Sequence, residues 1–118
     1  MEACHCRMCR RWTGSMFIDV SVKDGDLRFE SDSTLAWFES SKHARRGFCS
    51  VCGSSLFFKM KLNGAPWGVL AGTLDLPAGL EIGEEVFIDE KPDYYALAGE
   101  RSHVTSAEMH ARLKEALK

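Results

Sequence analysis

Apolar and polar residues alternate in short runs through the middle of the chain, as in strands that bury one face. In residues 16–22 (MFIDVSV), Ile18, Val20 and Val22 lie on one face of such a strand. Turn signals at 23–26 (KDGD) and 63–66 (NGAP) separate the runs. Strands are predicted over residues 16–22, 27–30, 35–40, 44–48, 55–61 and 67–74. Consecutive short strands joined by turns favour a meander of antiparallel hairpins.

The pattern changes in the last third of the chain. Residues 84–90 (EEVFIDE) predict one more short strand. Thr105 followed by Glu108 forms a capping box, and Met109, Leu113 and Leu117 then recur on one helical stripe. We therefore expect a C-terminal helix over about residues 106–117 that packs this stripe on the sheet.

Length and composition indicate one globular domain spanning residues 1–118. The formal net charge of −2 disfavours nucleic acid as a partner. No apolar run approaches the length of a membrane span, and the N-terminus has no secretory signal, so no membrane partner is expected. Five cysteines without a signal peptide predict a cytoplasmic protein whose reduced thiols bind metal rather than form disulfides.

The cysteines fall into two groups, Cys4-x-Cys6-x-x-Cys9 and Cys49-x-x-Cys52. Residues i and i+2 of an extended segment face the same side, so Cys4 and Cys6 can point together. A C-x-x-C turn aims both sulfurs at one point. Because thiolates in such spacing are preferred zinc ligands, the sequence predicts one or two bound Zn²⁺ ions.

Two divisions of the five thiols are compatible with this spacing. In the first, four thiols close a structural site and one is spare. In the second, Cys4, Cys6 and Cys9 hold one zinc with an open fourth position, and Cys49 and Cys52 serve another site. Three protein ligands plus an exchangeable position are typical of catalytic zinc.

Arg10, Arg11 and Trp12 follow the first cysteine group directly. We expect the two arginines to bind a carboxylate of an incoming thiol ligand and Trp12 to wall the pocket. The alternatives are a solvated pair of charges and a tryptophan in the core. His5 would face away from the metal in a strand. No catalytic residue is assigned beyond the zinc ligands.

The segments CHCRMCRRWTG, SSKHARRGFCSVCGSSLF and GVLAGTLDLP, in this order, resemble the glutathione-dependent formaldehyde-activating (GFA) family, also called the centromere-protein-V/GFA domain. The resemblance covers about residues 4–97. It implies a mainly β fold of short, coiled antiparallel sheets around zinc, a β-tent. It also implies carbon–sulfur lyase activity of the S-(hydroxymethyl)glutathione synthase type, with glutathione as the thiol and formaldehyde as the aldehyde.

Carried over by motif, the resemblance implies that Cys4, Cys6 and Cys9 hold a catalytic zinc and that Cys49 and Cys52 contribute to a structural zinc. The family's structural site takes two further thiols from a C-x-C on an earlier strand, and no such C-x-C precedes Cys4 here. Three interpretations compete: a longer natural chain, an unmetallated Cys49 and Cys52, or one pooled site. We favour pooling of Cys49 and Cys52 with two of the first three cysteines.

The expected function is therefore a carbon–sulfur lyase acting on a thiol adduct such as S-(hydroxymethyl)glutathione. The alternative is a zinc-stapled module that binds protein or nucleic acid through a basic patch of Arg7, Arg10, Arg11, Lys42, Arg45 and Arg46. An uncovered sheet edge makes a homodimer a further expectation.

Overall fold

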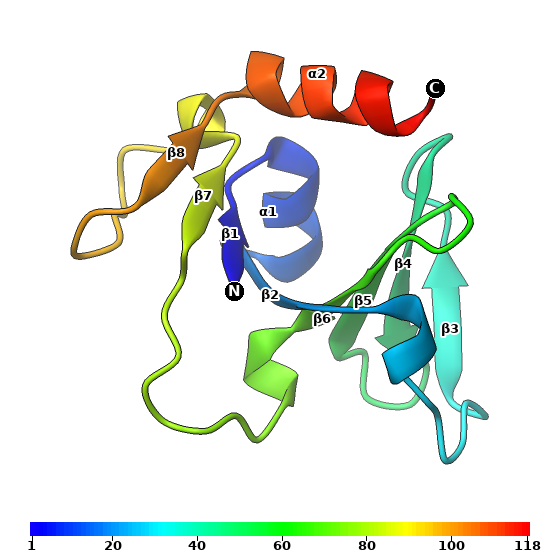
Figure 1. The fold of residues 1–118 in the computed structure, drawn as a ribbon. Helices are drawn as coiled ribbons and strands as arrows, with labels where there is room; N and C mark the ends of the chain where they lie inside the picture. The colour runs from blue at the N-terminus through cyan, green and yellow to red at the C-terminus, as the bar shows by residue number, and fades with distance from the viewer. The chain divides into compact units, whose positions relative to one another are not determined.

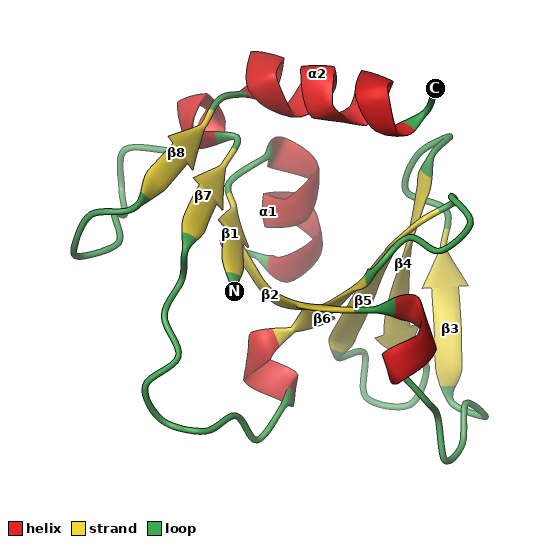
Figure 2. Cartoon of the chain, in the orientation of Figure 1, coloured by secondary structure: helices red, strands yellow, loops and turns green.

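Eight β-strands and two α-helices provide most of the regular structure in the computed structural model, which describes residues 1–118 (Figure 2). The predicted mainly β fold with a C-terminal helix is confirmed. The chain divides into two compact units, one of residues 1–18 and 77–118 and the other of residues 19–76. Whether the two units form the single domain predicted over residues 1–118 depends on how they associate, so that domain assignment stays a prediction. Neither helix is long and apolar enough to span a lipid bilayer.

The unit of residues 19–76 is an antiparallel sheet in the order β3-β4-β5-β6-β2 (Figure 1). Its strands are the part of β2 (Phe17–Val22) from residue 19 onward, β3 (Leu35–Phe38), β4 (Ala44–Cys49), β5 (Ser55–Met60) and β6 (Trp67–Leu70). Strands β3 to β6 form the predicted meander, each paired with the next along the chain. Strand β2 pairs antiparallel with β6.

An aromatic cluster covers one face of this sheet. The ring of Trp67 lies 5.5 Å from Phe57, 5.7 Å from Phe29 and 5.9 Å from Trp37, centroid to centroid. The guanidinium of Arg45 lies 4.0 Å from the centre of the Trp37 ring. Edge-on aromatic contacts and a cation over a ring each add to the apolar burial, so the cluster contributes to the stability of this unit.

The prediction of a strand at residues 27–30 is wrong. This segment has no strand pairing, although its Phe29 packs edge-on against Phe57 and Trp67. The apolar residue that suggested a strand is therefore used for packing on the aromatic cluster and not for extending the sheet.

The other unit holds three strands that run parallel in the order β1-β7-β8. Its elements are β1 (Glu2–Cys4), α1 (Arg7–Thr13), β7 (Glu84–Val86), the 3₁₀ turn η3 (Ile88–Glu90), β8 (Ser102–Val104) and α2 (Ser106–Ala116). The antiparallel meander predicted for the middle of the chain does not extend to these three strands, which pair in parallel. Parallel pairing needs long connections, and residues 87–101 supply one between β7 and β8.

The C-terminal helix α2 begins with the predicted capping box, in which Thr105 and Glu108 exchange side-chain and backbone hydrogen bonds. Its apolar stripe packs less closely than expected, since no residue of α2 is buried. Polar contacts attach the helix instead. Ser106 donates to Asp89 over 2.8 Å, and Arg112 pairs with Glu84 over 2.9 Å.

The aromatic cluster makes Gly47 a sensitive position. A Cβ atom there would lie 3.1 Å from Leu35 and Trp37 and 3.2 Å from Phe57. Overpacking of this kind costs about 1–3 kcal/mol. We expect Gly47→Ala to lower the free energy of unfolding, measured by urea denaturation, by that amount. Gly72→Ala is the matched control, because a Cβ atom added there would have no other atom within 4 Å. Equal denaturation midpoints for the two variants would contradict the packing described.

Candidate functional site

The first cysteine group is assembled where β1 passes into the short helix α1. Cys6 is the N-cap residue of α1, with an extended backbone (φ −63°, ψ 152°), and its Sγ accepts a hydrogen bond from the Cys9 amide over 3.3 Å. Gly14 ends the helix in the left-handed conformation at φ 81°. A cap and a single turn therefore bring the third sulfur back to the first two. This helix was not predicted, because seven residues are too few to show an amphipathic period.

The sulfurs of Cys4, Cys6 and Cys9 all lie within 4.8 Å of one another, the spacing of a group able to hold a metal ion. Cys4 and Cys9 are buried, at 7% and 5% exposure, whereas Cys6 is half-exposed. Tetrahedral thiolate coordination of zinc places neighbouring sulfurs about 3.8 Å apart. The three sulfurs thus need only a small contraction to become ligands of one ion, and Cys6 lies on the side that solvent reaches.

Electrostatics also favour a cation at this cluster. Hydrogen bonds to Cys6 and Cys9, burial, and repulsion from charge on those two thiols raise the pKa of the Cys4 thiol well above its ordinary value. A divalent cation reverses this balance, because it stabilises all three thiolates together. The donor set of three close sulfurs, two of them buried, therefore fits Zn²⁺.

The second cysteine pair belongs to the unit of residues 19–76, where Cys49 ends β4. The amide of Gly53, at φ 78°, donates to the Cys49 carbonyl over 2.8 Å and closes a tight C-x-x-C turn. Backbone amides of Cys52 and Val51 donate to the Cys49 sulfur and, with smaller contributions from Cys52 and Thr34, lower the pKa of this thiol to about 7. Cys52 is exposed, and its sulfur lies 3.1 Å from Ser54 Oγ. How the five sulfurs divide between ions stays a prediction.

The residues predicted to bind substrate lie on α1, directly after Cys9. Arg10 is half-buried, and its Nε donates to the His5 carbonyl over 3.0 Å. Arg11 is exposed. Trp12 stacks on Phe17 with ring centroids 5.9 Å apart, so at least one of its faces is used for packing. Their substrate-binding roles stay predictions.

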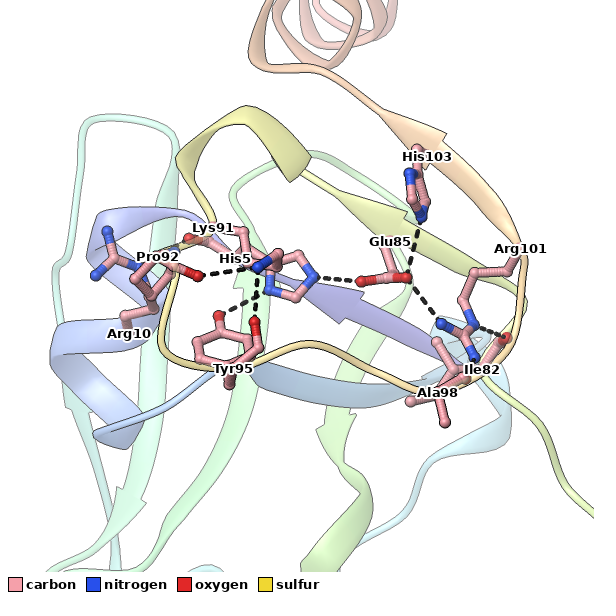
Figure 3. A network of polar contacts seen from close by, with 10 residues as sticks. All are labelled: His5, Arg10, Ile82, Glu85, Lys91, Pro92, Tyr95, Ala98, Arg101 and His103. Atoms are coloured by element: carbon pink, nitrogen blue, oxygen red, sulfur yellow. Dashed lines mark hydrogen bonds and ion pairs between the residues drawn. The ribbon is translucent and has the colours of Figure 1, made fainter.

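Sequence reasoning missed the polar groups that surround His5. The His5 side chain is fully buried and contacts Glu85 and Tyr95, which lie 80 and 90 residues further along the chain (Figure 3). Burial acts to raise the pKa of Glu85, but hydrogen bonds from Arg101 and His5 outweigh it and hold this pKa below its usual value. No local motif marks Glu85 or Tyr95, because only the parallel pairing of β1 with β7 brings Glu85 close.

Fold and cluster together define a mainly β protein with a group of three cysteines that could hold a metal ion, placed where β1 passes into α1. A family profile described as "Glutathione-dependent formaldehyde-activating enzyme" matches residues 1–90, and the chain belongs to this family. It is also similar to an uncharacterized lyase of Schizosaccharomyces pombe, with 30% identity over 109 residues. That alignment covers 92% of this chain and 79% of the relative.

The contrast between Cys4 and Cys49 can be measured in the metal-free protein. The thiolate is the reactive form, so alkylation speeds up as pH rises through the pKa. In iodoacetamide pulses between pH 5 and 9, mapped by mass spectrometry, we expect Cys49 to react with a midpoint near pH 7. Cys4 should stay unmodified over this range. The Cys49 midpoint should be unchanged in the control variant Cys52→Ser, because this substitution keeps the backbone amides. A Cys49 midpoint near the ordinary thiol value of about 8.5 would contradict the turn geometry.

Proposed function

We propose that this protein is a zinc-dependent carbon–sulfur lyase that acts on thiol adducts such as S-(hydroxymethyl)glutathione. The observation that carries the proposal is the cluster of three sulfurs within 4.8 Å of one another, of which Cys6 is half-exposed. Membership of the GFA family and similarity to a protein named as a lyase support the same reaction class. Since all five cysteines are free, the protein fits a reducing compartment, and we assign it to the cytoplasm.

In place of the pooled site favoured from the sequence, we propose that Cys4, Cys6 and Cys9 hold the catalytic zinc, because their sulfurs lie within 4.8 Å of one another. When bound there, zinc would supply positive charge beside a position open to a substrate thiol, which would favour the deprotonated, nucleophilic form of that thiol. The protein contributes the shape and charge around that position. Two of its sulfurs are buried, so the accessible side of the cluster is defined by Cys6 and the residues of α1.

Arg10 and Arg11 would bind a carboxylate of glutathione. The Nε of Arg10 is engaged with the His5 carbonyl, which fixes the guanidinium and leaves its two terminal nitrogens for an anion. Arg11 is exposed and adds positive charge on the same helix. Trp12 is held by its stack on Phe17 and would limit the space beside the thiol.

The chemistry is one reversible addition. The thiolate sulfur forms a bond to the carbonyl carbon of formaldehyde, the π pair moves to the oxygen, and that oxygen takes a proton from solvent. In the reverse direction the hydroxyl loses its proton as the carbon–sulfur bond breaks. No side chain is assigned as acid or base, so the residues named act by binding and orienting the reactants.

Cys6→Ser tests the metal centre selectively. Serine is a good N-cap, so the variant keeps an acceptor for the Cys9 amide while it removes one thiolate. We expect wild-type protein to accelerate adduct formation from glutathione and formaldehyde above the buffer rate, and Cys6→Ser to lose both this activity and zinc. Loss of the two reactants can be followed by NMR. A wild-type rate equal to buffer would overturn the proposed function.

Arg10→Gln tests carboxylate binding. A charge-assisted hydrogen bond contributes about 1.5–3 kcal/mol, so the KM for glutathione should rise by at least about 10-fold. Arg28→Gln, at an exposed arginine of the other unit, is the control and should leave KM unchanged. An unchanged KM in Arg10→Gln would remove this residue from the binding site.

A further inference from the structure

His5 lies between two of the clustered cysteines, yet the proposed reaction gives it no role. It is completely buried, with 0% exposure, and its side chain is not one of the ligand groups. Burying a polar side chain without partners is costly, so such a residue has to be fully hydrogen-bonded. The partners of His5 indicate what this buried residue does.

Every polar group of His5 is engaged. Its Nε2 donates to Glu85 Oε1 over 2.8 Å, and its Nδ1 lies 2.8 Å from the Tyr95 hydroxyl (Figure 3). Its amide donates to the Val86 carbonyl over 3.1 Å, and its carbonyl accepts from Arg10 Nε over 3.0 Å. The residue is therefore held on both ring nitrogens and on both sides of its backbone.

The partners of His5 are themselves fixed. Glu85 is 4% exposed, and its second oxygen accepts from Arg101 over 2.8 Å and lies 3.2 Å from His103 Nε2. Lys91 donates to the Tyr95 carbonyl over 2.6 Å, and its ammonium lies 5.4 Å from the centre of the Tyr95 ring. The buried carboxylate is thus balanced by cationic and polar groups on both of its oxygens.

His5 connects this network to the proposed metal centre, because it lies between Cys4 and Cys6 in the chain. The backbone is extended at β1 and at Cys6, so the His5 side chain lies on the face opposite Cys4 and Cys6. The hydrogen bonds of the His5 side chain with Glu85 and Tyr95 therefore hold in place the peptide units that carry two of the three sulfurs. The His5 carbonyl also accepts a hydrogen bond from Arg10 Nε and so orients the Arg10 guanidinium.

We propose that Glu85 and Tyr95 are positioning residues that act through His5, setting both the zinc affinity of the thiol cluster and the orientation of Arg10. The effect on zinc is independent of the reaction. The effect on substrate affinity rests on the proposed function. Outer partners that orient metal-binding groups typically change metal affinity by about 10- to 100-fold when they are removed.

Tyr95→Phe is the most selective test, since it removes one hydroxyl and keeps the ring. We expect the zinc dissociation constant, measured by competition with a chelator, to rise by about 10-fold. Glu85→Gln removes the charge facing His5 and should raise the zinc dissociation constant by up to about 100-fold. The control is Tyr94→Phe, because this neighbouring tyrosine loses the same hydroxyl and is 77% exposed. The control should keep the wild-type dissociation constant.

A merely structural role predicts a different result. It would lower the thermal stability of the metal-free protein and leave zinc affinity and the Co²⁺ absorption spectrum unchanged well below the melting temperature. That outcome in Tyr95→Phe would overturn the inference, even if Glu85→Gln fails to fold. Failure of the proposed function is separate: wild-type protein without activity, but with zinc affinity that depends on Tyr95, would disprove the lyase and retain the positioning role.

Discussion

Three cysteine sulfurs held within 4.8 Å of one another are the constraint on which the rest of this structure depends. Thiolates this close repel each other, and the burial of Cys4 and Cys9 makes their charge more costly still. A divalent cation at the cluster removes both costs and supplies folding free energy. The cap and first turn of α1 keep the three sulfurs together despite these costs, and the proposed ion accounts for this arrangement.

Very little chain is needed to build the cluster. An extended segment presents two sulfurs, the N-cap at Cys6 starts a helix, and its first turn returns Cys9. Seven residues of helix would not be stable alone, so their geometry depends on surrounding contacts. Among those contacts are the hydrogen bonds of Glu85 and Tyr95 with the buried side chain of His5. The three clustered sulfurs and the buried polar network therefore lie on two faces of one short segment, and Arg10 contacts that segment at the His5 carbonyl.

Local patterns predicted local structure well. Alternation and turn residues located β3 to β6, and the capping box at Thr105 located α2. Cysteine spacing identified the group that the fold brings together. Long-range features were missed for a physical reason. The parallel pairing of β1 with β7 joins residues 82 positions apart, as Glu2 and Glu84 show, and no period in the sequence encodes it. Glu85 and Tyr95 became visible as partners of His5 only in three dimensions.

The division of the sulfurs is best tested by X-ray absorption at the zinc edge of the Cys49→Ser/Cys52→Ser protein, purified without added thiol. A centre formed by Cys4, Cys6 and Cys9 predicts one zinc per chain, with three sulfurs at about 2.3 Å and one lighter atom. Loss of the zinc, or an ion with only two sulfur neighbours, would show that the second cysteine pair is needed to complete the site and would contradict an open three-thiolate centre.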